Sequence, residues 1–507
     1  MIMDTILTAF SLVFEWGTLL AVVLASVFGL VVGAIPGLTA TMAIALLVPI
    51  TFFLGPFAAV GSMIACSAMA IFAGDIPGTL LRMPGTPASA AYTDEVYAMT
   101  RNGQARLALG ANLVFSAAGG VFGTLALMLA APALAEFATG FSSFEYFWMV
   151  MLGLTCATVV GGSDMTKGLI SLLIGLGIAT IGINNPAGAL RFTFGSINLT
   201  GGVDFISAMI GLFAVSEILR YARSNHQKSM PKQQEFGHLF SNTWTLTRKY
   251  WPQQLRGNFV GVLVGALPGA GADIASWIAY AVSKKFSKTP EKFGTGHIEG
   301  VIESTSANNA ALGGSWIPAM VFGIPGDTIT AIVIGVLYMK GMDPGPSTFI
   351  SHPEKIYAIF ILFLFANLLM VPLGWIAIKM SYKVLSIPQA TLMPLILLFC
   401  IVGAYATTNS VYGVLLMAIF GVLGYLMEAR GFPVAPAILG LVLGPMLEES
   451  FVNSMISADG NLAGLVSRPV AGSLALLCAF VWISPLISKV VKNFRKPRLK
   501  SIGVPGV

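Results

Sequence analysis

The chain has 507 residues, of which 56% are hydrophobic and only 10% are charged, with a formal net charge of +6. Soluble domains carry about 25% charged residues, so this composition excludes a soluble protein and indicates a polytopic membrane protein. The net charge does not indicate a nucleic-acid partner, because the basic residues concentrate in loops. A transporter, a channel and a membrane enzyme remain possible.

The first apolar stretch, residues 16–74, contains no Asp, Glu, Lys or Arg. The residues before it lack the basic region of a cleaved signal sequence, so we expect this stretch to be retained. Further apolar runs follow, at about 107–135, 144–162, 168–184, 203–219, 356–378, 386–427, 431–447 and 469–488. One span needs about 20 apolar residues, so the runs predict an all-α membrane protein with about 10–14 transmembrane or re-entrant helices.

Two motifs occur twice, in the same order. "GLVVGAIPGLTATMA" at 29–43 matches "GVLVGALPGAGADIA" at 261–275, and "IPGTLLRMPGTP" at 76–87 matches "IPAMVFGIPGDT" at 317–328. Similar segments in the two parts of a membrane protein are typical of transporters that are built from internal repeats. We therefore predict two homologous halves.

The repeats and the charges predict the organisation of the chain. The first membrane repeat is 1–221, a basic linker is 222–256, the second repeat is 257–488 and a basic tail is 489–507. The positive-inside rule places the linker and the tail in the cytoplasm. Five spans between Ala58 and the linker then invert the second half relative to the first and leave the N-terminus periplasmic and the C-terminus cytoplasmic.

Four Pro-Gly breaks interrupt apolar segments in matched pairs, Pro36-Gly37 with Pro268-Gly269 and Pro84-Gly85 with Pro325-Gly326. Proline removes a backbone donor and glycine tolerates non-helical dihedrals, so each break leaves backbone groups without a helical partner. Such a break is tolerated at membrane depth only where it faces protein or a water-filled cavity. Paired broken helices and helical hairpins therefore indicate the binding site of a transporter. The alternative is a simple proline kink that neighbouring helices accommodate.

Polar residues cluster around these breaks. Hydroxyls and carboxylates at such points suit cation coordination or a hydrogen-bonded anion, although Ser, Thr and Asp are also favoured helix caps. Asp75 and Arg82 flank the break at Pro77. They predict either a structural ion pair or an anion-contacting Arg82 that is held by Asp75. Asn308 and Asn309 place amide groups inside an apolar helix, where capping does not explain them.

At these residues the sequence resembles the large membrane subunit of the tripartite tricarboxylate transporters, the TctA family. The matching blocks are "GAIPGLTATMAIALLVPITF" (33–52), "PGTPASAA" (84–91), "GALPGAGADIASWIAYAVSKKFSK" (265–288), "SANNAALGG" (306–314) and "GIPGDTITAIVIG" (323–335). The resemblance implies a multi-pass protein of the bacterial inner membrane that imports a carboxylate, driven by a Na⁺ or H⁺ gradient. It also implies two partners, a small four-span subunit of the TctB type and a periplasmic binding protein of the TctC type.

The predicted site follows from the breaks and from this resemblance. The residues expected to bind substrate are Pro36, Gly37, Thr39, Arg82, Gly85, Thr86, Pro268, Gly269, Gly271, Asn308, Asn309, Pro325, Gly326 and Thr328. Those expected to serve the coupling cation are Asp75, Asp273, Ser304, Thr305 and Asp327. The chain departs from the usual family pattern at positions 75, 82, 273, 305 and 327, which changes the charge at the breaks themselves.

The resulting prediction is ion-coupled uptake of a small di- or tricarboxylate by alternating access, without a cofactor and without enzymatic activity. No nucleotide-binding, metalloprotease or serine-hydrolase motif occurs in the sequence. One alternative is a channel-like or structural subunit that carries nothing itself. Another is an intramembrane aspartyl protease, because Asp75, Asp273 and Asp327 lie in or beside apolar segments.

Overall fold

The computed structural model describes residues 2–35, 38–160, 165–183, 188–223, 243–269, 271–385 and 389–495. These residues form helices joined by short connections, and the predicted all-α class is confirmed. Seven helical segments are long and apolar enough to cross a membrane: Trp16–Ala34, Pro56–Leu81, Ala105–Ala138, Phe205–Arg223, Pro353–Ser381, Val411–Ala429 and Val434–Ser457. Shorter apolar helices, including Ala40–Thr51 and Thr328–Met339, lie between them.

The helices of the first part of the chain are α1 (Ile2–Val13), α2 (Trp16–Ala34), α3 (Ala40–Thr51), α4 (Pro56–Ala73), α5 (Asp75–Leu81), α6 (Thr93–Arg101), α7 (Ala105–Ala138), α8 (Ser143–Val160), α9 (Met165–Ala179), α10 (Phe205–Ile210), the π-helical segment η3 (Gly211–Val215) and α11 (Ser216–Arg223). Those of the second part are α12 (Thr243–Gly265), α13 (Gly271–Phe286), α14 (Ile298–Phe322), α15 (Thr328–Met339), α16 (Pro346–Ser351), α17 (Pro353–Leu385), α18 (Gln389–Thr408), α19 (Val411–Ala429), α20 (Val434–Ser457) and α21 (Pro469–Arg495).

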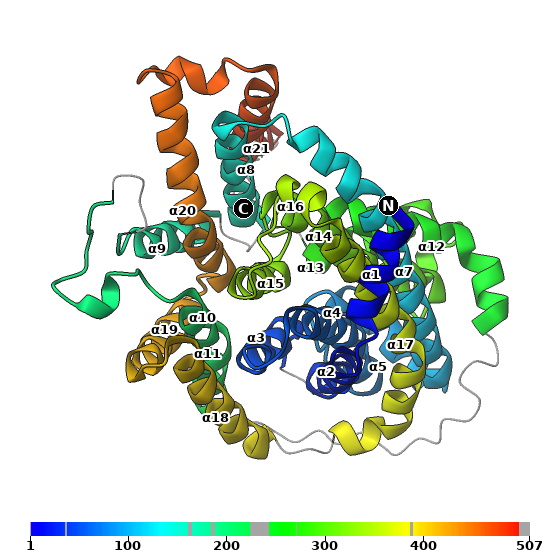
Figure 1. The fold of residues 1–507 in the computed structure, drawn as a ribbon. Coiled ribbons are helices and arrows are strands. Elements are labelled where there is room, and N and C mark those ends of the chain that lie inside the picture. Colours follow the sequence, from blue (N-terminus) through cyan, green and yellow to red (C-terminus); the bar gives the residue numbers. More distant parts are fainter. Residues whose placement is uncertain are drawn as a thin grey trace, which may run out of the picture.

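These helices form two groups (Figure 1). The central bundle contains α1–α7 and α12–α17, with α14 packed against α7, α12 and α13. The side bundle contains α8–α11 and α18–α21, with α20 packed against α8 and α9, and α19 against η3. The short helices α3 and α15 lie between the two groups and contact α10, and α3 also contacts α18 while α15 contacts α20. Each bundle therefore contains segments from both parts of the chain.

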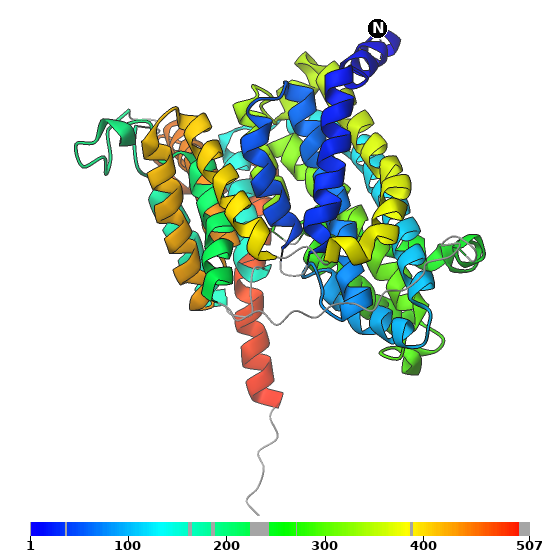
Figure 2. The ribbon, with the colours of Figure 1, turned by 90° about the horizontal axis from the view of Figure 1, so that it is seen from below.

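The second view shows how the bundles are oriented. The long helices of both run alongside one another, α1 lies at one end of the molecule, and α21 projects beyond the other helices at the opposite end (Figure 2). This arrangement suits a protein whose long helices cross a bilayer.

Glycines let the helices of the central bundle approach closely. Gly257, Gly261 and Gly265 on α12 repeat every four residues, and a Cβ at each position would lie 2.3–2.4 Å from a carbonyl oxygen of α14. Gly119 and Gly123 of α7 meet the same helix in the same way. Small residues at crossings let backbones touch, which is how helices associate in a membrane, where lipid provides no hydrophobic drive between them.

As a result, α14 is enclosed on all sides, and 24 of its 25 residues, from Glu299 to Phe322, are buried. An ion pair fixes its first half, because both carboxylate oxygens of Glu303 accept hydrogen bonds of 2.6 Å from the Arg256 guanidinium of α12. Two parallel bonds between these planar groups add geometric specificity to the attraction. The helix is thus held in one register.

Glu95 of α6 joins the two parts of the chain at one end of the central bundle. Its buried carboxylate accepts hydrogen bonds from the backbone amides of Gly294, Gly296 and His297 and from the Tyr280 hydroxyl, at 2.5–2.8 Å. One carboxylate therefore satisfies three amides of the loop before α14, and it ties that loop to the first part of the chain.

Candidate functional site

The first break separates α2 from α3. Pro36 and Gly37 themselves lie outside the described residues. After the break, Thr39 caps α3, because its side-chain oxygen accepts a hydrogen bond of 3.2 Å from the amide of Met42. Helix α3 therefore begins at the break and exposes its N-terminus there.

The matching break of the second part forms the tip of the hairpin α12–α13. Gly269 and Gly271 have φ values of 81° and 59°, which is the left-handed region that favours glycine. Gly271 also packs tightly, since a Cβ there would lie 2.5 Å from the Cβ of Asp327. The tip of this hairpin thus rests against the start of α15.

The break at Pro325-Gly326 separates α14 from α15. Gly323 ends α14 with a φ of 67°, and Asp327 starts α15 with a capping box in which its Oδ1 accepts a bond of 2.7 Å from the amide of Thr330. The other carboxylate oxygen accepts a bond of 3.2 Å from the Ser315 hydroxyl. Helix capping therefore occupies part of the Asp327 carboxylate.

These breaks surround one cavity of about 450 Å³. Of the residues predicted to bind substrate, Thr39, Thr86, Gly269, Gly271, Asn308 and Thr328 line it, and so do Asp273 and Asp327 of the predicted cation site. Both polar atoms of the Asn308 amide group are buried and have no hydrogen-bond partner among the described residues. The cavity thus collects predicted site residues from five segments of the chain, two in its first part and three in its second.

Direct contacts join the two parts of the chain across this cavity. The Thr41 and Thr328 hydroxyls, at the starts of α3 and α15, lie 3.1 Å apart. The amide of Ala88, after the break at Pro84-Gly85, donates a bond of 3.1 Å to the Asp273 carboxylate of α13. Each break of the first part therefore meets a break of the second part.

Other predicted site residues lie behind this surface. Pro268, Gly85, Pro325, Gly326, Asn309, Ser304 and Thr305 belong to the same breaks or to α14 but do not line the cavity. Asp75 is buried between α5, α6 and α14, where it accepts hydrogen bonds from the Tyr92 hydroxyl at 2.5 Å and from the Thr305 hydroxyl at 3.2 Å. Thr305 in turn contacts Ser116 at 2.8 Å.

The predicted pairing of Asp75 with Arg82 is wrong. Arg82 ends α5 in a left-handed conformation, with a φ of 59°, which turns its side chain away from the buried carboxylate. It pairs instead with Asp94 at 2.9 Å, and both side chains are more than 60% exposed. Arg82 does not line the cavity.

Sequence reasoning missed the second wall of the cavity, which belongs to the side bundle. Phe213 of η3, Glu217 and Arg220 of α11, and Glu428 of α19 line this wall. Arg220 stands just before the basic linker in the sequence, but it lies on a helix and lines the cavity. A signal existed in the sequence: Glu217 and Arg220 are three residues apart at the end of an apolar run, which is the spacing of an ion pair on one helix face.

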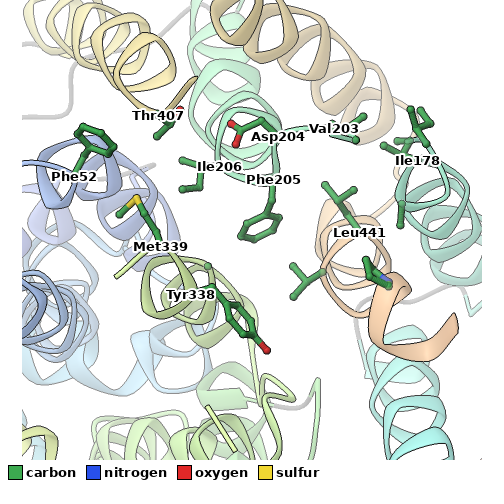
Figure 3. A pocket seen from close by; sticks show the side chains of 16 residues that line it. Phe52, Ile178, Val203, Asp204, Phe205, Ile206, Tyr338, Met339, Thr407 and Leu441 are labelled. Carbon is green, nitrogen blue, oxygen red and sulfur yellow. The ribbon is translucent and has the colours of Figure 1, made fainter. Parts of the chain in front are cut away.

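A second cavity, also of about 450 Å³, lies between the same bundles at the opposite ends of α3 and α15 (Figure 3). Its lining is mostly apolar and includes Phe52 after α3, Tyr338 of α15, Phe205 of α10 and Leu441 of α20. The seam between the bundles therefore holds a polar cavity near one end and an apolar one near the other.

Comparison with known proteins bears on this arrangement. A family model described as "Tripartite tricarboxylate transporter TctA family" matches residues 19–439, a range that contains every residue lining the polar cavity. The chain belongs to this family. It is therefore a multi-pass membrane subunit of a transporter and not an enzyme, which confirms the resemblance seen in the sequence and excludes the protease alternative.

Two relatives of this TctA chain come from Agrobacterium vitis. An uncharacterized 52.8 kDa protein in the TAR-I ttuC' 3' region is 35% identical over 468 residues, which cover 90% of this chain and 92% of the relative. An uncharacterized protein in the TAR-II ttuC' 3' region is 39% identical over 230 residues, 45% of this chain and 95% of the relative. No solved structure matches the chain.

Proposed function

We propose that this TctA protein is the large membrane subunit of a binding-protein-dependent secondary transporter, and that it imports a small di- or tricarboxylate together with Na⁺ or H⁺. Its partners are a small four-span subunit of the TctB type and a periplasmic binding protein of the TctC type, as the family implies. The observation that carries the proposal is the convergence of broken helices from both parts of the chain on one polar cavity.

Three helix starts at this cavity favour an anion. The first residues of α3, α13 and α15 line it, so three helix N-termini, whose first-turn amides have no carbonyl partner within their own helix, lie around one space. Each N-terminus carries a partial positive charge of roughly +0.5, and such ends hold anionic substrate groups in transporters with broken helices. Thr39, Thr86 and Thr328 add hydroxyls that can donate hydrogen bonds to a carboxylate.

The charges at the cavity favour a coupled cation. Four carboxylates line it, those of Asp273, Asp327, Glu217 and Glu428, against one guanidinium. An anionic substrate would be repelled unless cations or protons neutralise some of these groups first. We assign the coupling role to Asp273 and Asp327, and a second cation position to Asp75 with Ser304 and Thr305.

The arrangement along the chain supports alternating access. Segments 1–221 and 257–488 act as inverted repeats, with the basic linker 222–256 and the tail 489–507 in the cytoplasm. The polar cavity reaches α11, which leads into the linker, and this supports an inward-facing state. The central bundle carries the site and moves along the side bundle, with the apolar cavity as the path on the periplasmic side.

Uptake by the complete three-component system tests the proposal. Cells that express it are offered radiolabelled citrate, succinate, malate, tartrate and butyrate, with and without a sodium gradient and with and without an uncoupler. We expect gradient-dependent accumulation of at least one polycarboxylate. Loss of accumulation without sodium would identify Na⁺ as the coupling ion, and loss only with the uncoupler would identify H⁺. Accumulation of none would contradict carboxylate transport, and equilibration without concentration would indicate a channel.

Two matched variants test the coupling residues in the same assay. Asp273→Asn should reduce uptake about tenfold or more at unchanged abundance in the membrane, because it removes a cation ligand or proton carrier. Asp94→Asn should leave uptake unchanged, since Asp94 is 70% exposed and lies away from the cavity. Full uptake by the Asp273 variant would contradict its role in coupling.

A further inference from the structure

The two walls of the polar cavity differ in what they offer a carboxylate. The wall of the central bundle provides helix N-termini and hydroxyls, together with Asp273 and Asp327. The wall of the side bundle provides Arg220, and of the described residues that line the cavity it alone is basic. Any direct charge-to-charge recognition of an anion here therefore falls to Arg220.

Of the two carboxylates that Arg220 contacts, Glu428 is the weaker partner. One guanidinium nitrogen contacts Glu217, three residues earlier on the same helix, and the other lies 3.6 Å from the Glu428 carboxylate of α19. That Glu428 oxygen is buried and accepts no hydrogen bond from the described residues, so its own contact with Arg220 is electrostatic only. The Arg220 side chain is 52% exposed, and ion pairs of such exposure contribute little to stability.

A substrate carboxylate would be a better partner than Glu428. A guanidinium presents a planar fork of donors that matches both oxygens of one carboxylate, which gives two short bonds in place of one long contact. Exchange of Glu428 for such a group therefore gains hydrogen bonds and loses only a weak ion pair. It also adds a bond between the substrate and the side bundle.

We propose that Arg220 binds one carboxylate of the substrate and releases Glu428 in doing so, while a second carboxylate of the same molecule binds at the starts of α3, α13 and α15. The substrate then bridges the two bundles, and this bridging requires a molecule with at least two carboxylates. The inference rests on the transport function proposed above, and it adds the residue that recognises the second carboxylate.

The proposed role of Arg220 is tested by measuring uptake kinetics of the wild-type protein and three variants. Two substrates are compared: the polycarboxylate that the panel above identifies, and butyrate as the monocarboxylate probe. Arg220→Gln should raise the half-saturation concentration for the polycarboxylate about tenfold or more, because it removes the charge-assisted pair of hydrogen bonds, and should reduce the preference for the polycarboxylate over butyrate. Arg220→Lys should recover part of this loss, because it keeps the charge but not the fork. Glu428→Gln should lower the half-saturation concentration, because it removes the competitor.

Arg220→Gln and Glu428→Gln are expected to change the half-saturation concentration in opposite directions, and this distinguishes a role in substrate recognition from a purely structural role. If Arg220 and Glu428 only held α11 to α19, both neutral variants would lower the melting temperature and impair uptake alike. Arg223→Gln is the control, because Arg223 lies on the same helix but bonds to the Tyr425 hydroxyl at 2.7 Å, away from the cavity. It should behave as wild type.

The outcomes distinguish the two proposals. If the wild type accumulates a polycarboxylate and Arg220→Gln keeps the same half-saturation concentration and the same preference over butyrate, the role of Arg220 is overturned while the transport function stands. If the wild type accumulates no carboxylate at all, the proposed function fails and the role of Arg220 fails with it.

Discussion

At position 271 two requirements coincide, since the backbone has a φ of 59° and a Cβ would collide with Asp327. Sequence reasoning predicted that this glycine belongs to the site because "PGAGAD" breaks an apolar segment. It predicted Thr39, Thr86 and Thr328 because they follow such breaks, and Asn308 because it is an amide inside an apolar helix, and these residues do line one cavity. It missed Arg220, because a basic residue beside a basic linker has the same appearance in a sequence whether it faces the solvent or a binding site.

Substitution of Gly271 tests the packing of the hairpin tip. Gly271→Ala strains a left-handed residue by about 1–2 kcal/mol and also pushes Asp327 away, so we expect uptake to fall strongly. Gly341→Ala is matched for backbone strain, since its φ is 64°, but no atom lies within 4 Å of its added Cβ. That variant should keep most of its uptake. Equal losses would show that backbone strain matters and the contact with Asp327 does not.

The buried Asp75 carboxylate gives a second prediction at this scale. Tyr92→Phe removes the donor at 2.5 Å and leaves a buried acceptor with the Thr305 hydroxyl as its remaining hydrogen-bond partner. We expect the variant to lose about 1–3 kcal/mol of stability, measured as a lower melting temperature of the purified protein in detergent. Tyr97→Phe serves as the control. An unchanged melting temperature of the Tyr92 variant would mean that the carboxylate needs no donor there.

Among the helices, the breaks divide apolar segments into pieces that are too short to cross the membrane alone. Helices α3 and α15 have 12 residues each, or about 18 Å at 1.5 Å per residue, against a hydrocarbon core of about 30 Å. The Pro-Gly breaks in the sequence predicted these short helices directly. The sequence did not predict which helices form each bundle, because that depends on contacts between segments hundreds of residues apart, such as α7 with α14.

The glycine stripe of α12 should be essential for docking the hairpin. Gly261→Leu places a side chain where even a Cβ would lie 2.4 Å from the Ala307 carbonyl oxygen, so α12 must move away from α14. Overpacking of this kind costs about 1–3 kcal/mol, and we expect a lower melting temperature and weak uptake. Leu263→Phe enlarges a position on the same helix that is 67% exposed, and it should be tolerated. Normal stability of the Gly261 variant would show that the two helices can separate without cost.

For the whole molecule, the seam between the bundles is the feature that links the fold to transport. Helices α3 and α15 begin at the polar cavity and end at the apolar one, and the segment 205–223 runs past both in the opposite order. The sequence predicted the class of protein and the residues at the breaks. It could not predict a second cavity, since aromatic and aliphatic residues such as Phe52 and Leu441 look the same in a sequence whether they face lipid, protein or a cavity.

Cysteine labelling from the two sides of the membrane tests this geometry and the proposed orientation. Ala435→Cys lies in the polar cavity and Thr407→Cys in the apolar one. A membrane-impermeant maleimide should label the Thr407 variant in intact spheroplasts and the Ala435 variant in inside-out vesicles, with the wild-type protein as background. The reverse pattern would invert the topology, and labelling of both from one side would contradict separate openings.

The burial of α14 also affects how the protein is made. Because 24 of its 25 residues are enclosed by other helices, α14 has almost no face that must suit lipid, and it holds Glu303, Asn308 and Asn309 within a single span-length helix. Such a helix is a poor substrate for insertion on its own, since the translocon selects segments by their free energy of transfer to lipid. Its entry into the bilayer must therefore be guided by helices that are already there, and α7 and α12, which are synthesised before it and contact it, are in the right place to receive it. During biosynthesis, α14 therefore depends on helices that are inserted before it, so damage to α12 should first appear as a failure to insert the next helices.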